Sequence, residues 1–63
     1  MKVRDVIKEI VADGWFFVRM RGDHRFYEHP KKKGGVTVAG HPGDDVPIGT
    51  LKKIYKQAQI RRK

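Results

Sequence analysis

The sequence contains no cysteine, which excludes disulfide bonds and thiolate metal sites and fits a reducing compartment. It also has no apolar run that approaches the ~20 residues of a membrane-spanning helix. Residues 1–5 begin a charged stretch and lack the apolar core of a signal peptide. We therefore expect a cytoplasmic protein with no part embedded in a membrane.

Acidic residues are scarce as well, and the resulting net charge indicates what kind of partner the protein binds. The 63 residues include 15 Lys and Arg against 7 Asp and Glu, a net charge of +8. Such an excess indicates a polyanionic partner, most simply nucleic acid. An acidic protein, a membrane surface or a charge that serves only solubility would also explain it. The short length predicts one small domain over residues 1–63.

Apolar spacing predicts a helix near each end of the chain. Residues 3–13 carry apolar side chains at helical intervals, and Gly14 suits the left-handed position that follows a helix end. A second helix is predicted to begin at Thr50, whose hydroxyl would cap the first turn. The basic residues 61–63 are predicted to end this helix, where its dipole favours positive charge.

Between these helices the pattern changes to that of strands. Aromatic and β-branched residues predict strands over 15–21, 24–29 and 36–39. Gly22 and Asp23 predict a type I′ hairpin turn between the first two strands. The order α-β-β-β-α predicts an α+β fold, in which a three-stranded antiparallel sheet carries both helices on one face. The other face, or an edge, is then left for function.

The first strand raises a question of orientation. Phe16, Val18 and Met20 lie on one side of an ideal strand, and we expect this side to face the helices. Trp15 and Phe17 lie on the other side and are too large to be left bare, which favours a bulge or a partly covered second face. Most aromatic side chains are predicted to serve the core, because so short a chain needs them there.

His24 is the leading candidate for chemistry. It follows the predicted turn and has Arg19, Arg21 and Arg25 as neighbours in the sequence. A histidine titrates near neutral pH, so it can act as a base toward a ribose 2′-hydroxyl or as an acid toward the leaving oxygen. Arginines would bind the phosphate and stabilise its developing charge, and this route needs no metal. Asp23 would orient the imidazole or only form the turn.

His29 and His41 complete the set of histidines. Their intervals match no spacing that gathers metal ligands on one element, and residues 24 and 29 of one strand face opposite sides. We therefore predict no metal site and no cofactor. His41 begins a loop that can approach the sheet, and it is a candidate second acid/base.

The basic residues form groups that predict phosphate contacts along an RNA strand or duplex. Residues 31–35, here called the lysine loop, end in two glycines that would let it adapt to a ligand. The lysines of the last helix are equally well explained as a solvated outer face. The predicted RNA-binding residues are Arg19, Arg21, Arg25, Lys31, Lys32 and Lys33.

Several short pieces of the sequence form an ordered set along the chain. No single piece is very specific, but their order and spacing over nearly the whole chain are. The pieces are Gly14 with an aromatic, Val18-Arg19, Gly22-x-His24, the aromatic strand to His29-Pro30, Val36-x-Val38, His41-Pro42-Gly43, Asp45-x-Pro47 and Gly49-Thr50-Leu51. In this order and spacing the sequence resembles HicA-type toxins of bacterial and archaeal toxin–antitoxin pairs.

This resemblance implies a fold like that of the double-stranded-RNA-binding domain. It also implies a metal-independent endoribonuclease, an mRNA interferase that inhibits translation, with a HicB-type antitoxin as the protein that binds over its active surface. The family's catalytic histidine, in a Gly-Ser-His motif, corresponds to His24. Asp23 stands here in place of the usual serine, and Ala39 stands where the family often has a proline.

Two other functions remain compatible with the residues. One is a non-catalytic RNA-binding module of the same fold, in which His24 only contacts phosphate. The other is a protein-interaction domain that uses its charge to bind an acidic partner. Salt-dependent RNA binding without cleavage would indicate the first, and a lack of RNA affinity at physiological salt would indicate the second.

Overall fold

The predicted order of helices and strands is confirmed by the computed structural model, which describes residues 1–60. The elements are α1 (Val3–Ala12), β1 (Phe16–Arg21), β2 (His24–Glu28), β3 (Val36–Ala39) and α2 (Ile48–Ala58). The strands form an antiparallel sheet in the order β1-β2-β3, so the α+β prediction holds. The predicted basic end of the last helix, residues 61–63, lies outside the described residues. Within residues 1–60, neither helix has the length and apolar character to cross a bilayer.

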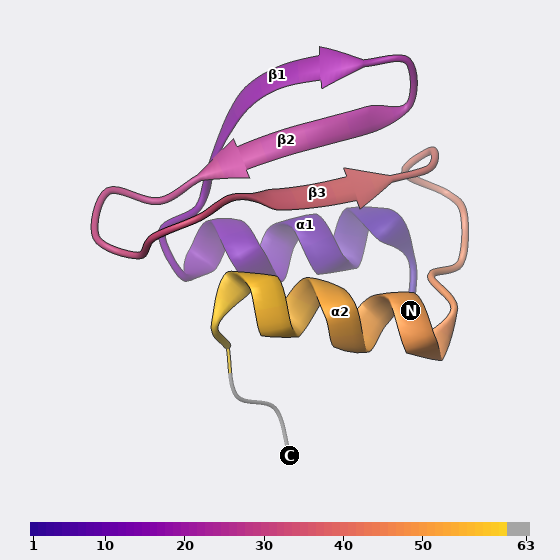
Figure 1. The fold of residues 1–63 in the computed structure, drawn as a ribbon. Coiled ribbons are helices and arrows are strands. Elements are labelled where there is room, and N and C mark those ends of the chain that lie inside the picture. Colours follow the sequence, from indigo (N-terminus) through magenta and orange to yellow (C-terminus); the bar gives the residue numbers. More distant parts are fainter. Residues whose placement is uncertain (61–63) are drawn as a thin grey trace.

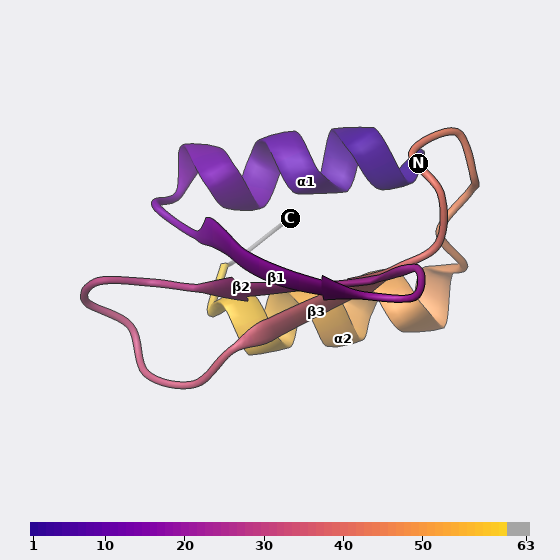
Figure 2. The ribbon, with the colours of Figure 1, turned by 90° about the horizontal axis from the view of Figure 1, so that it is seen from above.

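The helices gather at one side of the sheet and leave β1 uncovered. Both helices pack against β3, with α1 behind the sheet and α2 alongside β3 (Figures 1 and 2). The Thr37 backbone N–H of β3 donates to Oε1 of Gln57 in α2 at 3.4 Å. β1 is the edge strand farthest from both helices (Figure 1).

Gly14 ends α1 as the sequence predicts, although the helix stops at Ala12 and not at residue 13. Its φ is +110°, which a side chain would disfavour. The Gly14 N–H donates to the Val11 carbonyl at 3.0 Å, and the Trp15 N–H donates to the Ile10 carbonyl at 3.1 Å. These two bonds form a Schellman motif. The reversal places Trp15 in the core, where it is 1% exposed.

The prediction that Thr50 caps the last helix is wrong, because α2 begins earlier. Its N-cap is Pro47 and its first residue is Ile48, so Thr50 lies inside the first turn. The Leu51 N–H donates to the Pro47 carbonyl at 2.9 Å and makes the first helical hydrogen bond. The fixed φ of proline, here −58°, allows this entry without a side-chain cap.

The sheet contains the bulge that the sequence favours. Phe17 and Arg19 pair with consecutive residues of β2, so Val18 between them is an extra residue in β1. Cross-strand partners point to the same face of a sheet. The bulge therefore places Phe16 on the same face as Arg19 and Arg21, which an unbulged strand would not do.

The prediction that Phe16, Val18 and Met20 pack against the helices is wrong. These side chains are 49%, 37% and 49% exposed, and all of β1 is exposed. The bulge divides the set between the two faces, and β1 extends beyond the cover of the helices. Residues outside β1 supply the core instead.

The core lies between the two helices and the strands β2 and β3. Trp15 is its largest fully buried side chain, and its Nε1–H donates to the Ala58 carbonyl at 3.2 Å. The Tyr55 hydroxyl donates to the Glu9 carboxylate and joins the helices. The buried core residues are Val3, Val6, Ile10, Trp15, Tyr27, Val36, Val38, Val46, Ile54 and Ala58.

The hairpin turn between β1 and β2 differs from the predicted type I′. That type needs positive φ at both central residues. Gly22 has φ +60°, whereas Asp23 does not have a positive φ. A glycine with positive φ at the first position is the pattern of a type II′ turn. The order Gly-Asp therefore suits the turn that forms.

We expect Gly14→Ala to destabilise the fold by about 1–3 kcal/mol. An alanine would adopt a disfavoured positive φ, and its Cβ would lie 2.7 Å from Nε2 of His29. Gly43→Ala is the matched control, because a Cβ there meets nothing within 4 Å. Urea unfolding of the two variants measures the difference. An unchanged unfolding free energy for Gly14→Ala would contradict this account.

Candidate functional site

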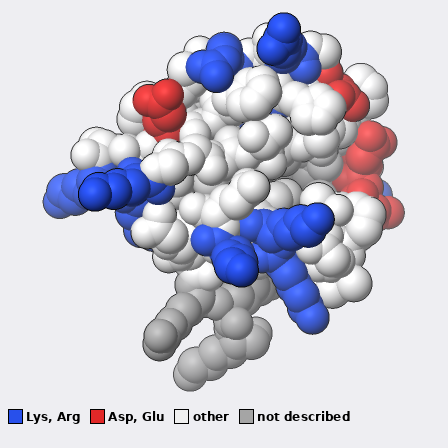
Figure 3. Space-filling model, viewed as in Figure 1, with Lys and Arg blue, Asp and Glu red and all other residues white. Residues whose placement is uncertain are grey.

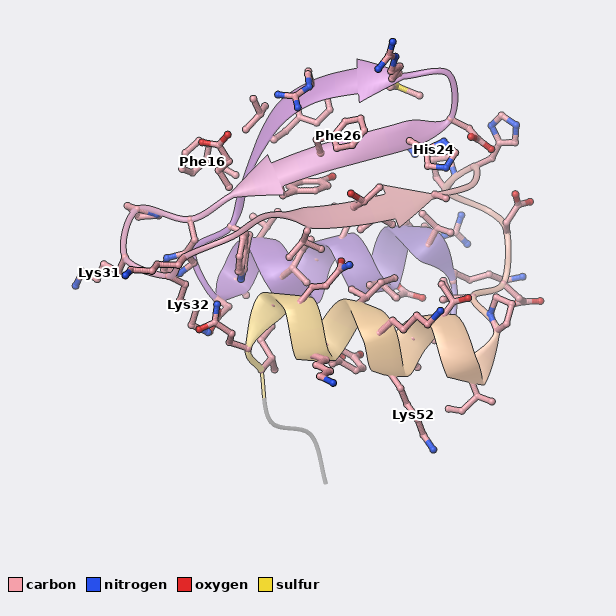
Figure 4. All side chains as sticks on the ribbon, viewed as in Figure 1. Phe16, His24, Phe26, Lys31, Lys32 and Lys52 are labelled. Atoms are coloured by element: carbon pink, nitrogen blue, oxygen red, sulfur yellow. The ribbon has the colours of Figure 1, made fainter. Side chains whose placement is uncertain are left out.

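Cross-strand pairing assembles rows of side chains on one face of the sheet, here called the outer face. The rows are Arg21, His24 and Ala39; Arg19, Phe26 and Thr37; and Phe16 with Glu28. Figure 4 shows Phe16, Phe26 and His24 following one another along the β1–β2 pair. The opposite, inner face carries the buried side chains of Tyr27, Val36 and Val38.

His24 is exposed at the end of the outer face beside the hairpin turn. Its Nδ1 lies 3.0 Å from Oδ1 of Asp23, and the two side chains are 54% and 47% exposed. A carboxylate in this position favours the tautomer with the proton on Nδ1. Nε2 is then left to accept a proton from a ligand. Arg21 is the cross-strand partner of His24, with a Cβ separation of about 5 Å expected for such pairs.

His41 starts from the same corner of the sheet. Ala39 is the register partner of His24, and the Gly40 N–H donates to the Asp23 carbonyl at 3.1 Å. These contacts hold the loop after β3 against the hairpin turn. His41 itself is exposed. The structure thus brings two of the three histidines to one end of the sheet.

A groove of about 280 Å³ lies on the outer face next to the lysine loop. The guanidinium carbon of Arg19 lies 4.9 Å from the centre of the Phe26 ring, which is a cation–π contact. The residues that line the groove include Arg19, Phe26, Glu28, Gly34, Gly35 and Thr37. The groove therefore combines an aromatic ring, a cation and a carboxylate.

Sequence reasoning missed Glu28 and Thr37 as residues of this face. Positions 24, 26 and 28 alternate along one strand, so the spacing alone could have placed Glu28 beside His24 and Phe26. Thr37 gave no such signal, because its position depends on the register between β2 and β3.

Arg25 lies on the inner face, apart from Arg19 and Arg21. Its register partner is Val38, and its Nη1 donates to the Gly40 carbonyl at 2.8 Å. The guanidinium thus ties β2 to the loop after β3, and it helps to hold the segment that leads to His41.

The lysines of the lysine loop have different surroundings. Lys32 Nζ bonds to Oδ2 of Asp13 at 2.5 Å and to two carbonyls at the end of α2 at 3.1 and 3.0 Å. A cation there satisfies carbonyls that the helix leaves without partners. Lys31 and Lys33 are exposed, and Lys31 points away from the fold (Figure 4). The loop therefore presents two lysines and is anchored by the third.

His29 is a structural residue, with only 8% of its side chain exposed. Its Nδ1 accepts the backbone N–H groups of Lys31 and Lys32 at 3.0 and 3.1 Å. The ring proton therefore lies on Nε2, which donates to the Asp13 carbonyl at 2.8 Å. The ring also packs edge-on against Trp15, with centroids 5.2 Å apart. Neither nitrogen of His29 is left for a substrate.

Tyr27 is also unsuited to proton transfer. Tyr27 is only 4% exposed, and burial raises the pKa of Tyr27 above its ordinary 10.0, so its hydroxyl gives up a proton less readily than that of an exposed tyrosine. Within the part of the chain that the structure describes, no three His, Asp or Glu side chains converge as a metal-binding set.

Positive charge surrounds an uncharged surface on the face seen in Figure 3. Lys and Arg side chains gather over β1, at the lysine loop and along α2, while acidic side chains collect mainly at the end of the molecule near the loop after β3. Phosphates and bases of a nucleic acid strand could make separate contacts with such a surface.

Comparison with known proteins identifies one family. Residues 3–60 match the family model described as the HicA toxin of bacterial toxin–antitoxin systems. This range contains every helix and strand of the structure. A comparison with curated proteins gave no match.

The contact between Asp13 and Lys32 predicts a pH-dependent stability. The hydrogen bond from Lys32 holds the pKa of Asp13 below its usual 3.8. A carboxylate whose pKa is lowered by folding stabilises the fold above its unfolded pKa, and this contribution is lost as the pH falls through the folded-state value. Asp13→Asn should therefore be less stable than the wild type at neutral pH.

This difference should shrink as the pH falls below about 3.8. Urea unfolding at a series of pH values measures it. Asp45→Asn is the control, because Asp45 is 75% exposed in its pair with Lys2 and such surface pairs contribute little. A difference between wild type and Asp13→Asn that grew on acidification would rule out this linkage.

Proposed function

The chain belongs to the HicA toxin family of bacterial toxin–antitoxin systems, and from this premise we propose that it is a metal-independent endoribonuclease. It cleaves mRNA and thereby inhibits translation, and it works in the cytoplasm, where mRNA is found. The observation that carries this proposal is the exposed pair of His24 and Asp23 beside Arg21 on the outer face.

His24 acts as the general base in this proposal. Asp23 holds the Nδ1 proton, so Nε2 takes the proton from a ribose 2′-hydroxyl. The resulting oxygen attacks the adjacent phosphorus, the bond to the 5′-oxygen breaks, and a 2′,3′-cyclic phosphate forms. The carboxylate of Asp23 also stabilises the imidazolium that His24 becomes.

Arg21 and a second histidine complete the chemistry. The Arg21 guanidinium stabilises the charge that builds on the phosphoryl oxygens. His41 gives a proton to the leaving 5′-oxygen, since it starts from the same corner of the sheet as His24. His29 and Tyr27 are poor alternatives, because the first uses both ring nitrogens and the second is buried.

Positive side chains away from His24 guide the rest of the RNA. Arg19 on the outer face and the exposed Lys31 and Lys33 of the lysine loop bind phosphates. Lys32 and Arg25 act indirectly in this scheme, because their side chains hold the lysine loop and the loop after β3.

A HicB-type antitoxin is the proposed protein partner, and it covers the outer face. Exposed apolar side chains on β1, Phe16 among them, provide contact area there. An antitoxin bound at this place would protect RNA from cleavage and would still bind a His24→Ala toxin. Loss of binding to Phe16→Ser with retained binding to Lys53→Ala would support this location, and the reverse result would refute it.

We expect His24→Ala and His24→Gln to lower RNA cleavage by roughly 10²- to 10⁴-fold, because neither side chain can transfer a proton. Cleavage of an unstructured RNA in buffer with a chelator measures this effect, and the products should carry a 2′,3′-cyclic phosphate. Arg4→Ala, an exposed cation on α1, is the control for loss of charge.

Growth of host cells that express each variant provides a second measurement. The His24 variants should be tolerated, whereas Arg4→Ala should be as toxic as the wild type. Equal cleavage and equal toxicity of wild type and His24→Ala would refute the catalytic assignment. Salt-dependent RNA binding by a wild type that cleaves nothing would indicate the non-catalytic RNA-binding module instead.

A further inference from the structure

We propose that the groove on the outer face holds one unpaired RNA base and that guanine fits it best. This inference rests on the proposed function, because it assigns a substrate preference to the same surface. The groove has about 280 Å³, which is near the small end of ligand pockets, roughly 300 Å³. A single planar base is the part of an RNA strand that suits such a size.

The position of the groove relative to His24 favours a base near the scissile bond. His24, Phe26 and Glu28 alternate along β2 and so project from the same face. Successive residues on one face of a strand are about 7 Å apart, which is similar to the spacing of adjacent nucleotides in an extended RNA. A phosphate at His24 therefore brings a neighbouring base to Phe26.

Phe26 and Arg19 provide the stacking surface. Phe26 is only partly buried, and the Arg19 guanidinium lies over its ring at 4.9 Å. Unpaired bases stack on aromatic rings and on guanidinium planes. A base that enters the groove can therefore stack on either member of this pair, and the positive charge of Arg19 also attracts the phosphates on each side.

The opposite wall is open because it is built from glycine. The residues Gly34 and Gly35 line the groove without side chains, and a Cβ added at Gly34 would meet nothing within 4 Å. The backbone of the lysine loop is fixed nearby by His29 and Lys32. The wall thus leaves space for a ligand, although its position is held by hydrogen bonds.

Glu28 determines which base is preferred. A carboxylate on a phosphate-binding surface repels the backbone of RNA, and within residues 1–60 the exposed side chain of Glu28 forms no ion pair or hydrogen bond. A carboxylate accepts hydrogen bonds through two oxygens. Guanine alone presents two adjacent donors, N1–H and the N2 amino group, on its Watson–Crick edge. Since this edge is occupied in a duplex, the substrate is single-stranded at this nucleotide.

Binding of non-cleavable RNA tests this inference. The probes are short 2′-O-methyl polyuridine strands that carry uridine, guanine, adenine or cytosine at one position, together with a wholly abasic strand of the same length, and fluorescence anisotropy measures their affinity for the full chain. The guanine strand should bind roughly tenfold to a hundredfold more tightly than the uridine strand, which is the discrimination of a bidentate contact. Glu28→Gln should lose most of this preference, because its amide has one acceptor oxygen.

Two further variants separate recognition from general effects. Asp45→Asn removes the same charge from an exposed site outside the groove and should keep the guanine preference. Phe26→Leu should weaken binding of every strand with a base in the groove by roughly tenfold, because stacking is lost. It should not weaken binding of the abasic strand, and circular dichroism shows whether the variant folds.

The outcomes distinguish this inference from the proposed function. His24→Ala should keep the guanine preference although it cleaves nothing. Equal affinity of the wild type for all strands, or a guanine preference that survives Glu28→Gln, would overturn the base site and leave the nuclease proposal standing. A wild type that prefers guanine but does not cleave ordinary RNA would overturn the nuclease proposal and leave the base site standing. A complete lack of RNA affinity, as expected of a domain that binds an acidic protein, would overturn both.

Discussion

The extra residue Val18 in β1 decides what the outer face of the sheet contains. Side chains alternate along a strand, so one inserted residue exchanges the faces of the residues before it relative to those after it. The bulge thereby puts the ring of Phe16 on the face that already carries Arg19 and Arg21. This face also carries His24 and Phe26 from β2. Cations and aromatic rings side by side are what single-stranded nucleic acid binds, and β1 can provide them because the core does not depend on it.

Residues of the same chemical type have different uses in this fold, and hydrogen bonding separates them. His29 bonds through both ring nitrogens and fixes the lysine loop, whereas the side chain of His24 lies beside Asp23 and stays exposed. Lys32 closes the end of α2, while its neighbour Lys31 extends from the surface (Figure 4). Bonded side chains such as those of His29 and Lys32 hold the lysine loop in place, and this loop presents the exposed Lys31 to a ligand. A small domain with little core gains rigidity in this way where its surface must be preorganised.

Acidic side chains within this basic surface also have defined surroundings. Asp23 replaces the serine usual for the family and lies at hydrogen-bonding distance from His24. Its negative charge is therefore directed at the imidazole of His24. Such a carboxylate favours the tautomer that a general base needs. In the proposed mechanism this departure from the usual motif is compatible with proton transfer at His24, and Asp23 serves as an orienting group.

The sequence by itself determined the element order, the end of α1 at Gly14, the third strand over residues 36–39, and the positive charge. These features follow from local spacing, backbone preference and composition, which depend on residues that are close together in the sequence. The tertiary structure decided which face each β1 residue occupies, that Lys32 and Arg25 bond within the fold, and that Glu28 and Thr37 border one groove. Those outcomes depend on a bulge, on strand register and on contacts between residues far apart in the chain. Arg25 shows what neighbouring residues alone do not determine. Its position beside His24 in the sequence suggested a shared site, but the pleat of the strand sends adjacent side chains to opposite faces.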